Sequence, residues 1–505
     1  MPDTIDSLVR RRAESEGDKP MVIDPAGRIT YRELDSTTRD LAAAFIEAGI
    51  AKGTRVALIM PNNSRWVQIA VALTRIGAVL VPLSTLLAAG ELVAQLRTAA
   101  VQFLVSVEAF RGHRYLDDVH SVPPLELPAL RQVWTVDQLA GLVASDRARG
   151  IIDALCDTVT EADPLFIVFT SGSSGPPKGV MHSHGSALGA VRSGLAARCI
   201  TSDTRLYLPM PFFWVGGLGS GILSALLAGA TLVTEEVPRP ESTLRLLQSE
   251  RVTLFRGWPD QAEALARHAG PAGADLSTLR PGSLDALLPP EHRARPGARA
   301  NLFGMTEAFG PYCGYPADTD MPPTAWGSCG KPFPGMQVRI VDQESGEPVA
   351  PGTVGMIQIR GPHTLRGICR RAREAVFTPD GFYPTGDLGH LDGEGFLFYH
   401  GRSDDMFKVS GATVYPSEVE RALRSIAGVE HAHVTNVPGA AGERVGAAVV
   451  CRGLTAEQLN ASARELLSAF KRPTVWLVLT SDDDLPRGAT GKVDTRRLRE
   501  MLAAV

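Results

Sequence analysis

Short apolar runs alternate with stretches of helical periodicity in the first part of the chain. Residues 55–60 (RVALIM) form a continuous apolar run, as expected for a buried strand, and residues 66–76 repeat apolar positions at helical spacing. A second apolar run, GAVLVPL at 77–83, is followed by the helix-compatible segment GELVAQLRTA. Repeated strand–helix–strand units of this kind predict an α/β fold with largely parallel sheets.

The pattern changes beyond residue 326. Residues 326–361 place Gly and Pro turns between alternating strands (QVRIVD and GMIQIRG), which predicts a small β-rich subdomain. After the segment GRSDD the pattern becomes that of a compact α+β unit of about 100 residues. We therefore expect a large N-terminal domain over residues 1–403, made of two βαβ-type layered subdomains and the β-rich one, and a small C-terminal domain over residues 404–505.

Composition and charge exclude several classes of protein. The chain has 505 residues, 44% of them hydrophobic and 21% charged, which is typical of a globular protein too long for a single core. Its net charge of −4 gives no electrostatic basis for binding nucleic acid or an anionic membrane. The first residues lack the apolar core of a signal peptide, and apolar runs such as 222–233 are too short to span a bilayer.

The six cysteines are scattered along the chain, with no C-x-x-C pair and no histidine cluster beside them. This spacing favours reduced thiols and argues against structural zinc. We therefore expect a cytoplasmic protein.

Residues 170–180 have the sequence TSGSSGPPKGV and follow an apolar, strand-like run. Small residues leave the backbone free to bend with its N–H groups exposed to an anion, and Lys178 can meet a phosphate as a point charge. The Walker A pattern requires a hydroxyl residue after the lysine, but here Gly179 follows it. The prolines at 176 and 177 stiffen the segment, unlike a linker. The loop therefore predicts nucleotide-phosphate binding of another kind.

This loop resembles the signature [ST]-S-G-[ST]-[ST]-G-x-P-K-G of the adenylate-forming superfamily, which includes acyl-CoA synthetases, peptide-synthetase adenylation domains and firefly luciferase. Four further motifs follow in the order of that family, so that five motifs span about 320 residues. The resemblance implies ATP binding by Thr170, Ser171, Gly172, Ser173, Ser174, Gly175 and Lys178.

The second motif is NLFGMTE at 301–307, similar to the family's Y-G-x-T-E. The resemblance places Phe303 and Gly304 at adenine, Thr306 at the α-phosphate and Glu307 on Mg²⁺. Phenylalanine retains the stacking face of the usual tyrosine but loses its phenolic hydrogen bond, and a carboxylate is a hard ligand suited to magnesium. Asn301 can present its amide to the adenine edge.

Three motifs in the last part of the chain complete the set: YPTGDL at 383–388, GRSDDMFKVSGATVYPSEVE at 401–420 and LPRGATGK at 485–492. They are similar to the family's Y-x-T-G-D, hinge and C-terminal lysine motifs. The resemblance implies that Asp387 and Arg402 bind the ribose, where an ionised carboxylate accepts hydrogen bonds from hydroxyl groups. It also implies that Lys492 approaches the reacting carboxylate and the α-phosphate.

In this family the small domain changes its position between the two half-reactions, and the resemblance implies the same motion in this chain. Asp404 is expected at the pivot, because hinges lie at the ends of elements. Gly411 is expected to line the path of pantetheine, since the absence of a Cβ permits close approach. Lys408 is expected to face the site in the second pose only, with an exposed surface lysine as the alternative.

The segment PMPFFWVGGLG at 209–219 resembles the family motif P-x-x-H-x-x-G, which precedes the acyl pocket. Trp214 stands where relatives often have histidine. We expect an acyl pocket at this segment, with one of its aromatic residues as a gate. A packed core cluster is the alternative. The residues assigned to the pocket are Phe212, Phe213, Trp214, Gly216 and Gly217.

Two features of the sequence bear on the acid. No aspartate occurs in 209–219, which argues against an α-amino acid, because amino-acid-activating domains normally pair the substrate ammonium there. Residues 280–292 (RPGSLDALLPPEH) lack the family's G-G-[AS]-P turn, so this wall of the pocket is unusual. A hydrophobic or aromatic carboxylic acid fits best.

The resemblance implies an acid:CoA ligase that uses ATP and Mg²⁺ to form acyl-AMP and then transfers the acyl group to CoA. Two alternatives keep the adenylation step but change the acceptor: an acyl-AMP ligase that loads a carrier protein, and an ATP-dependent diazotase that uses nitrite and an aryl amine. A non-enzymatic binding protein is the third class. We expect a monomer or homodimer.

Overall fold

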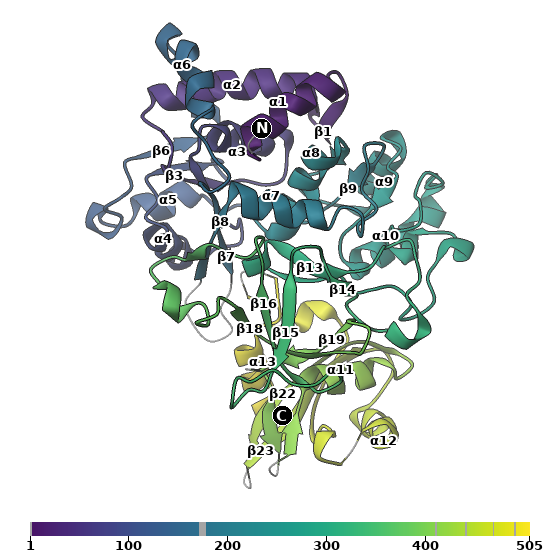
Figure 1. Cartoon of the computed structure of the whole chain (residues 1–505). Helices are drawn as coiled ribbons and strands as arrows, with labels where there is room; N and C mark the ends of the chain where they lie inside the picture. The colour runs from purple at the N-terminus through teal and green to yellow at the C-terminus, as the bar shows by residue number, and fades with distance from the viewer. Residues whose placement is uncertain are drawn as a thin grey trace. The chain divides into compact units, whose positions relative to one another are not determined.

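The computed structural model describes residues 3–170, 178–403, 405–409, 412–439, 442–467, 469–488 and 491–505. The chain folds into two compact units, each built from two segments (Figure 1). The first unit comprises Met1–Gln337 and Arg360–Phe382, and the second comprises Val338–Ile359 and Tyr383–Val505. The expected domain boundary at Asp404 lies outside the described residues and stays a prediction.

A seven-stranded sheet in the order β17-β8-β7-β4-β3-β5-β6 forms one layer of the first unit. Its strands β3 to β7 pair in parallel, whereas β8 and β17 add to its edge in antiparallel fashion. The predicted strand–helix–strand repeat is confirmed, since β3 is followed by α3, β4 and α4. The elements are β3 (Arg55–Ile59), α3 (Ser64–Arg75), β4 (Val79–Pro82), α4 (Ala89–Thr98), β5 (Phe103–Ser106), α5 (Tyr115–His120), β6 (Gln132–Thr135), α6 (Asp146–Cys156), β7 (Pro164–Thr170), β8 (Lys178–Ser183), α7 (His184–Ser193) and β17 (Gly367–Ile368).

A second sheet of the first unit has the order β11-β9-β10-β1-β2, and a third, small sheet has the order β12-β13-β14. The elements are α1 (Ile5–Glu16), β1 (Pro20–Asp24), β2 (Gly27–Thr30), α2 (Tyr31–Glu47), β9 (Arg205–Tyr207), α8 (Ser224–Ala228), β10 (Thr231–Val233), α9 (Pro240–Ser249), β11 (Leu254–Phe255), α10 (Pro259–Ala272), β12 (Phe303–Met305), β13 (Gly310–Gly314) and β14 (Lys331–Pro332). The first two sheets share one apolar core, in which Trp66 of α3 meets Phe212 edge-to-face with ring centroids 5.4 Å apart. Burying a side chain of this size stabilises the fold by roughly 2–3 kcal/mol.

The second unit contains the β-rich segment and the α+β unit that the sequence pattern predicts. One sheet has the order β15-β16-β18-β19, and another has the order β22-β23-β24. The elements are β15 (Gln337–Val341), β16 (Gly355–Arg360), β18 (Tyr383–Leu391), β19 (Leu397–Arg402), β20 (Phe407–Val409), β21 (Ala412–Val414), α11 (Pro416–Arg424), β22 (Val429–Gly439), β23 (Gly442–Cys451), α12 (Ala456–Leu466), β24 (Val475–Leu479) and α13 (Thr495–Ala503). None of the helices in the described ranges is long and apolar enough to cross a bilayer.

A buried ion-pair network joins the first three helices. The guanidinium of Arg75, on α3, has no exposed surface. Its Nη2 lies 2.7 Å from a carboxylate oxygen of Asp6 on α1 and 2.8 Å from one of Asp35 on α2. Its Nη1 donates to the Thr38 hydroxyl over 2.8 Å. Because one fully buried guanidinium binds both carboxylates, the three helices are fixed in register.

We expect Asp6→Asn to lower the free energy of unfolding by about 3 kcal/mol, because the substitution leaves part of the buried Arg75 charge uncompensated. Chemical denaturation would measure the change. Asp18→Asn is the control, since the Asp18–Arg32 ion pair is exposed, with 90% and 66% of the two side chains accessible, and should contribute less than about 1 kcal/mol. Equal effects of the two substitutions would contradict a structural role for the network.

Candidate active site

The ends of the predicted phosphate loop meet on adjacent strands. Thr170, the last residue of β7, is the register partner of Lys178, the first residue of β8. The antiparallel pairing therefore holds both ends of the loop together and keeps Lys178 at its mouth, partly exposed. The predicted phosphate-binding residues Ser171, Gly172, Ser173, Ser174 and Gly175 lie outside the described residues.

The predicted adenine motif forms β12 and the start of a tight turn. A Cβ on Gly304 would lie 2.1 Å from the carbonyl oxygen of Gly310, so glycine is required where β12 approaches β13. The neighbouring ring of Phe303 meets Tyr312 edge-to-face, with centroids 5.5 Å apart. Asn301 is exposed and donates its backbone N–H to Ser328 over 3.3 Å. The aromatic side chain expected at adenine is thus held by a second ring.

Main-chain hydrogen bonds fix the turn that carries the predicted magnesium ligand. The carbonyl oxygen of Thr306 accepts from the Phe309 N–H over 3.0 Å and from Nε2 of His182 over 2.8 Å. The carbonyl oxygen of Glu307 accepts from the Leu365 N–H over 2.7 Å. Glu307 itself is only 6% exposed. Both predicted residues therefore lie on a turn whose backbone has little freedom.

Phe309 closes this turn in the left-handed region, with φ at +53°, which is uncommon for a residue with a side chain. Its ring stacks on Phe166 of β7 at 5.5 Å with an interplanar angle of 7°. The ring of His182 meets Phe309 edge-on at 5.0 Å. The aromatic packing holds a backbone conformation that the local sequence alone does not favour.

His182 is neutral in the folded protein, because burial lowers its pKa to about 4. A carbonyl oxygen can only accept, so the proton is on Nε2, which donates to Thr306. The other ring nitrogen, Nδ1, has no hydrogen-bond partner among the described residues. His182 and Phe309 were not predicted from the sequence, because neither occupies a motif position and their contact joins segments more than 120 residues apart.

The predicted metal ligand Glu307 is a single carboxylate. The described residues contain no group of three or more His, Cys, Asp or Glu side chains placed to hold a metal. Mg²⁺ is commonly bound by one or two carboxylates together with substrate phosphates. A single predicted carboxylate, Glu307, is therefore compatible with magnesium and does not resemble a structural zinc cage.

The predicted ribose residues form an ion pair within the second unit. Asp387 and Arg402 are register partners on β18 and β19, and their side chains approach to 3.2 Å. Nη1 of Arg402 also donates to the carbonyl oxygen of Thr385 over 2.9 Å. The hydroxyl of Thr385 in turn accepts from the Asp387 N–H over 3.0 Å. The acceptor and the donor expected at the ribose are thus oriented by one another.

The predicted residues of the last part of the chain are described only in part. Lys408 lies on β20 opposite Thr413, and its side chain is outside the described structure, as are Asp404 and Gly411. Lys492 is exposed, and its carbonyl oxygen accepts from the Gly488 N–H over 2.9 Å. This lysine therefore lies at the surface of the second unit.

The aromatic residues of the predicted acyl segment differ in exposure, since Phe212 and Phe213 are buried and Trp214 is partly exposed. Phe212 is fully buried against Trp66, and its N–H donates to the Asn62 side chain over 2.8 Å. Trp214 is partly exposed and meets Trp258 edge-to-face at 5.9 Å. The packed-cluster alternative thus describes Phe212, whereas the gate at Trp214 stays a prediction. Trp258 was not predicted from the sequence as part of the acyl site.

The glycines after these aromatic residues begin a π-helix, η3 (Gly216–Leu223). A Cβ on Gly217 would lie 2.1 Å from the Pro211 carbonyl oxygen, so this glycine permits the close approach of the preceding loop. Phe213 is buried and contacts Trp214 edge-to-face at 5.4 Å. π-helical turns occur often at functional sites.

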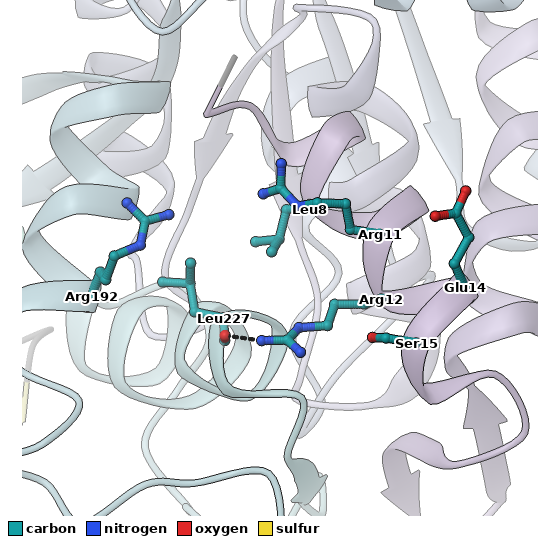
Figure 2. Close-up of a pocket in the computed structure, with 7 residues that line it drawn as sticks. All are labelled: Leu8, Arg11, Arg12, Glu14, Ser15, Arg192 and Leu227. Carbon is teal, nitrogen blue, oxygen red and sulfur yellow. Dashed lines mark hydrogen bonds between the residues drawn. The ribbon is translucent and has the colours of Figure 1, made fainter. Parts of the chain in front are cut away.

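Two surface hollows lie away from these residues. The hollow of about 610 Å³ in Figure 2 lies beside α1, and two of its arginines are bound within the chain. Arg12 donates to the carbonyl oxygens of Leu226 and Leu227, and Arg192 binds both carboxylate oxygens of Asp3 at 2.6 Å. A second hollow, of about 510 Å³, is lined by residues of the segment 360–381. No residue predicted for the nucleotide or acyl sites lines either of these two hollows.

Comparisons with known proteins agree with the motifs. The profile of the AMP-binding enzyme family matches residues 9–369. A 3-[(3aS,4S,7aS)-7a-methyl-1,5-dioxo-octahydro-1H-inden-4-yl]propanoyl:CoA ligase of Mycobacterium tuberculosis is 34% identical over 99% of this chain and 98% of its own. A 3-hydroxybenzoate–CoA ligase of Aromatoleum sp. (strain CIB) is 30% identical over 97% and 95% of the two chains.

Solved structures show the same fold. The O-succinylbenzoate coenzyme A synthetase MenE from Bacillus subtilis, in complex with AMP, has a TM-score of 0.81 at 24% identity, over 99% of this chain and 98% of its own. MatB from Rhodopseudomonas palustris, bound to ATP, has a TM-score of 0.80 at 25% identity, over 100% and 99% of the two chains. The predicted α/β fold is confirmed.

The buried His182 makes the stability of the first unit depend on pH. Between pH 6.5 and 4 the unfolded chain binds a proton on this imidazole that the folded chain does not, so the free energy of unfolding falls as the pH is lowered through that window. At pH 5 the loss amounts to about 2 kcal/mol. We expect His182→Gln to unfold with a smaller difference between pH 7.5 and pH 5 than the wild type.

Denaturant unfolding at the two pH values measures this difference. His120→Gln, at an exposed position, is the matched control for removing an imidazole. An unchanged pH dependence in His182→Gln would contradict the assignment of a neutral, proton-donating imidazole at the Thr306 carbonyl.

Proposed function

We propose, because this chain belongs to the AMP-binding enzyme family, that it activates a hydrophobic, ring-containing carboxylic acid as acyl-AMP and transfers the acyl group to CoA. The observation that carries this proposal is the alignment, over nearly the whole chain, with curated relatives named as CoA ligases of cyclic acids. The chain is accordingly an AMP-forming acid:CoA ligase whose substrates are ATP, CoA and a carboxylic acid.

In the first half-reaction, a carboxylate oxygen of the acid attacks the α-phosphorus of ATP and diphosphate leaves. Two anions must approach each other, so the residues around the α-phosphate have to neutralise charge. Lys178 at the mouth of the loop and Lys492 supply cationic groups, and Glu307 would hold Mg²⁺ against the phosphates. The magnesium ion, when bound, supplies Lewis-acid stabilisation of the phosphate charge.

The nucleoside is bound by groups whose orientation is already fixed. The face of Phe303 stacks on adenine and the amide of Asn301 reaches its edge. The hydroxyl of Thr306 donates to the α-phosphate. Asp387 accepts from the ribose hydroxyls, and the ion pair with Arg402 orients that carboxylate.

In the second half-reaction, the CoA thiol displaces AMP from the acyl-AMP and an acyl thioester forms. We propose that residues 404–505 turn as a body about Asp404 relative to residues 1–403 between the two steps. Lys492 then leaves the site, and the segment with Lys408 and Gly411 replaces it. The absence of a Cβ at Gly411 leaves room for pantetheine.

The acid is proposed to be cyclic and hydrophobic because of the aromatic residues beside η3. Trp214 and Trp258 meet edge-to-face and both are partly exposed, so they offer flat apolar surfaces to a ring. No aspartate lies in 209–219 to pair with an ammonium group. We further propose that the enzyme acts in the cytoplasm as a monomer or homodimer.

The proposed activity can be tested by measuring AMP and diphosphate release from purified protein with Mg-ATP. Pools of aromatic, medium-chain and polycyclic acids would be supplied with and without CoA, and nitrite with aryl amines would form a separate pool. We expect CoA-dependent AMP release and a new acyl-CoA mass from a cyclic acid. Turnover with nitrite, or adenylate formation indifferent to CoA, would overturn the proposed acceptor.

Two substitutions separate the half-reactions. Lys492→Ala should reduce acyl-AMP formation at least about a hundredfold, because a cation at the reacting oxygens is lost, but should still convert supplied acyl-AMP and CoA to thioester. Gly411→Leu should do the opposite, because a side chain would obstruct pantetheine. The measurement is single-turnover kinetics of each step. If Lys492→Ala slows both steps equally, the two-pose assignment is wrong.

A further inference from the structure

A buried arginine without a carboxylate partner lies behind the π-helix η3. Arg198 is 4% exposed. Its Nη2 donates to the carbonyl oxygen of Val191 over 2.6 Å, and its Nη1 reaches the Ser220 hydroxyl at 3.5 Å. Its Nε has no hydrogen-bond partner among the described residues. A guanidinium offers five N–H donors, so most of this donor capacity is unused.

A second guanidinium stands next to it. Arg256 follows β11 and donates its Nη2 to the carbonyl oxygen of Arg198 over 3.1 Å. Burial lowers the pKa of both arginines, and that of Arg198 falls to about 10. No carboxylate in the described part of the chain lies within ion-pair distance of either guanidinium, although the negative charge of Asp318 raises the pKa of Arg256 from farther away. The buried charge of Arg198 therefore has a like charge beside it, on the partly exposed Arg256.

Such an arrangement destabilises the free protein. Removing an ion from water costs several kcal/mol unless a counter-charge or a full set of hydrogen bonds replaces the lost hydration. Arg75 shows how the same fold satisfies a buried guanidinium that has a structural role, with two carboxylates and a hydroxyl. The absence of that arrangement around Arg198 indicates an acceptor supplied from outside the described chain.

The π-helix connects Arg198 to the reaction centre. Ser220, which Arg198 reaches, is partly exposed like Trp214 and Gly216, whereas residues 217–219 are buried. Gly219 is the neighbour of Ser220, and a Cβ built on it would lie 3.3 Å from the ring of Phe309. Phe309 closes the turn that carries Glu307. One wall therefore runs from the turn of the magnesium ligand, along η3, to the buried guanidinium.

We propose that Arg198, supported by Arg256, forms the far end of the acyl pocket and binds a carbonyl or carboxylate oxygen carried by the acid opposite its reacting carboxyl group. This inference rests on the proposed function and names the substrate class more closely, as an acid with a second, distal oxygen acceptor. A planar guanidinium donates two parallel N–H bonds to such an oxygen group, and the Ser220 hydroxyl adds a further donor.

The test uses three acids that differ only at the distal carbon: 3-cyclohexylpropanoate, 3-(4-oxocyclohexyl)propanoate and 3-(4-carboxycyclohexyl)propanoate. The wild type is expected to prefer one oxygenated acid over the unsubstituted acid by at least about tenfold in kcat/KM. Which oxygenated acid is preferred distinguishes a ketone site from a carboxylate site. Arg198→Met should abolish the preference, because kcat/KM for the preferred oxygenated acid should fall by at least about tenfold.

Thermal unfolding of the same variants separates specificity from structure. Arg198→Met should unfold at the same or a higher temperature than the wild type, because an apolar side chain of similar length replaces a buried, uncompensated charge. Arg245→Met, on the exposed face of α9, is the matched control and should change neither the preference nor the midpoint. A lower midpoint with an equal loss of activity toward all three acids would mean a structural role and would overturn the proposal.

Measuring the binding of each acid in the absence of ATP tests the distal site independently of the ligase assignment. Tryptophan fluorescence of the purified protein would be titrated with each acid, and Arg198→Met should weaken binding of the preferred oxygenated acid about tenfold. If the wild type makes no acyl-CoA but this binding difference persists, the proposed function fails and the distal site stands. If turnover occurs but Arg198→Met keeps the wild-type preference, the distal site is wrong and the ligase assignment stands.

Discussion

The predicted nucleotide site in the first unit depends on one short turn, from Thr306 to Phe309. Its backbone is held in a conformation that the residues themselves do not favour. Phe309 occupies the left-handed region, and the Thr306 carbonyl accepts hydrogen bonds from both Phe309 and His182. The rings of Phe166 and His182 enclose the side chain of Phe309. Because Phe166 and His182 lie on the seven-stranded sheet, core packing stabilises the turn that carries Glu307, the predicted magnesium ligand. The geometry of the proposed site is thereby coupled to the stability of the sheet.

Buried arginines show how environment decides the role of one residue type. Arg75 is surrounded by two carboxylates and a hydroxyl and fixes three helices in register. Arg198 is buried to a similar extent, but its nearest described acceptors are a main-chain carbonyl and a serine hydroxyl. The first arrangement is complete without a ligand. The second leaves donors unused, which is typical of a site that is completed by binding.

Sequence patterns predicted the elements better than the contacts between them. The apolar runs at 55–60 and 77–83 became β3 and β4, because a buried parallel strand requires little more than continuous apolar residues. The pairing of Asp387 with Arg402 was likewise expected from the two motifs that carry them. In contrast, Phe212 could not be distinguished from Trp214 in a row of aromatic residues. Only the tertiary contact with Trp66 buries one and leaves the other accessible. His182 was missed for the same reason.

The π-helix η3 affects how the proposed acyl pocket can change in evolution. A π-turn contains one more residue than an α-turn, so a single-codon deletion within Gly216–Leu223 would restore regular α-helical winding. Because the π-turn absorbs one extra residue, its removal would leave the flanking residues on the same faces of the helix and reshape the bulged part of the wall. A change in the length of this helix would therefore alter several wall positions together and could change the specificity in one step. Point substitutions alter these positions one at a time.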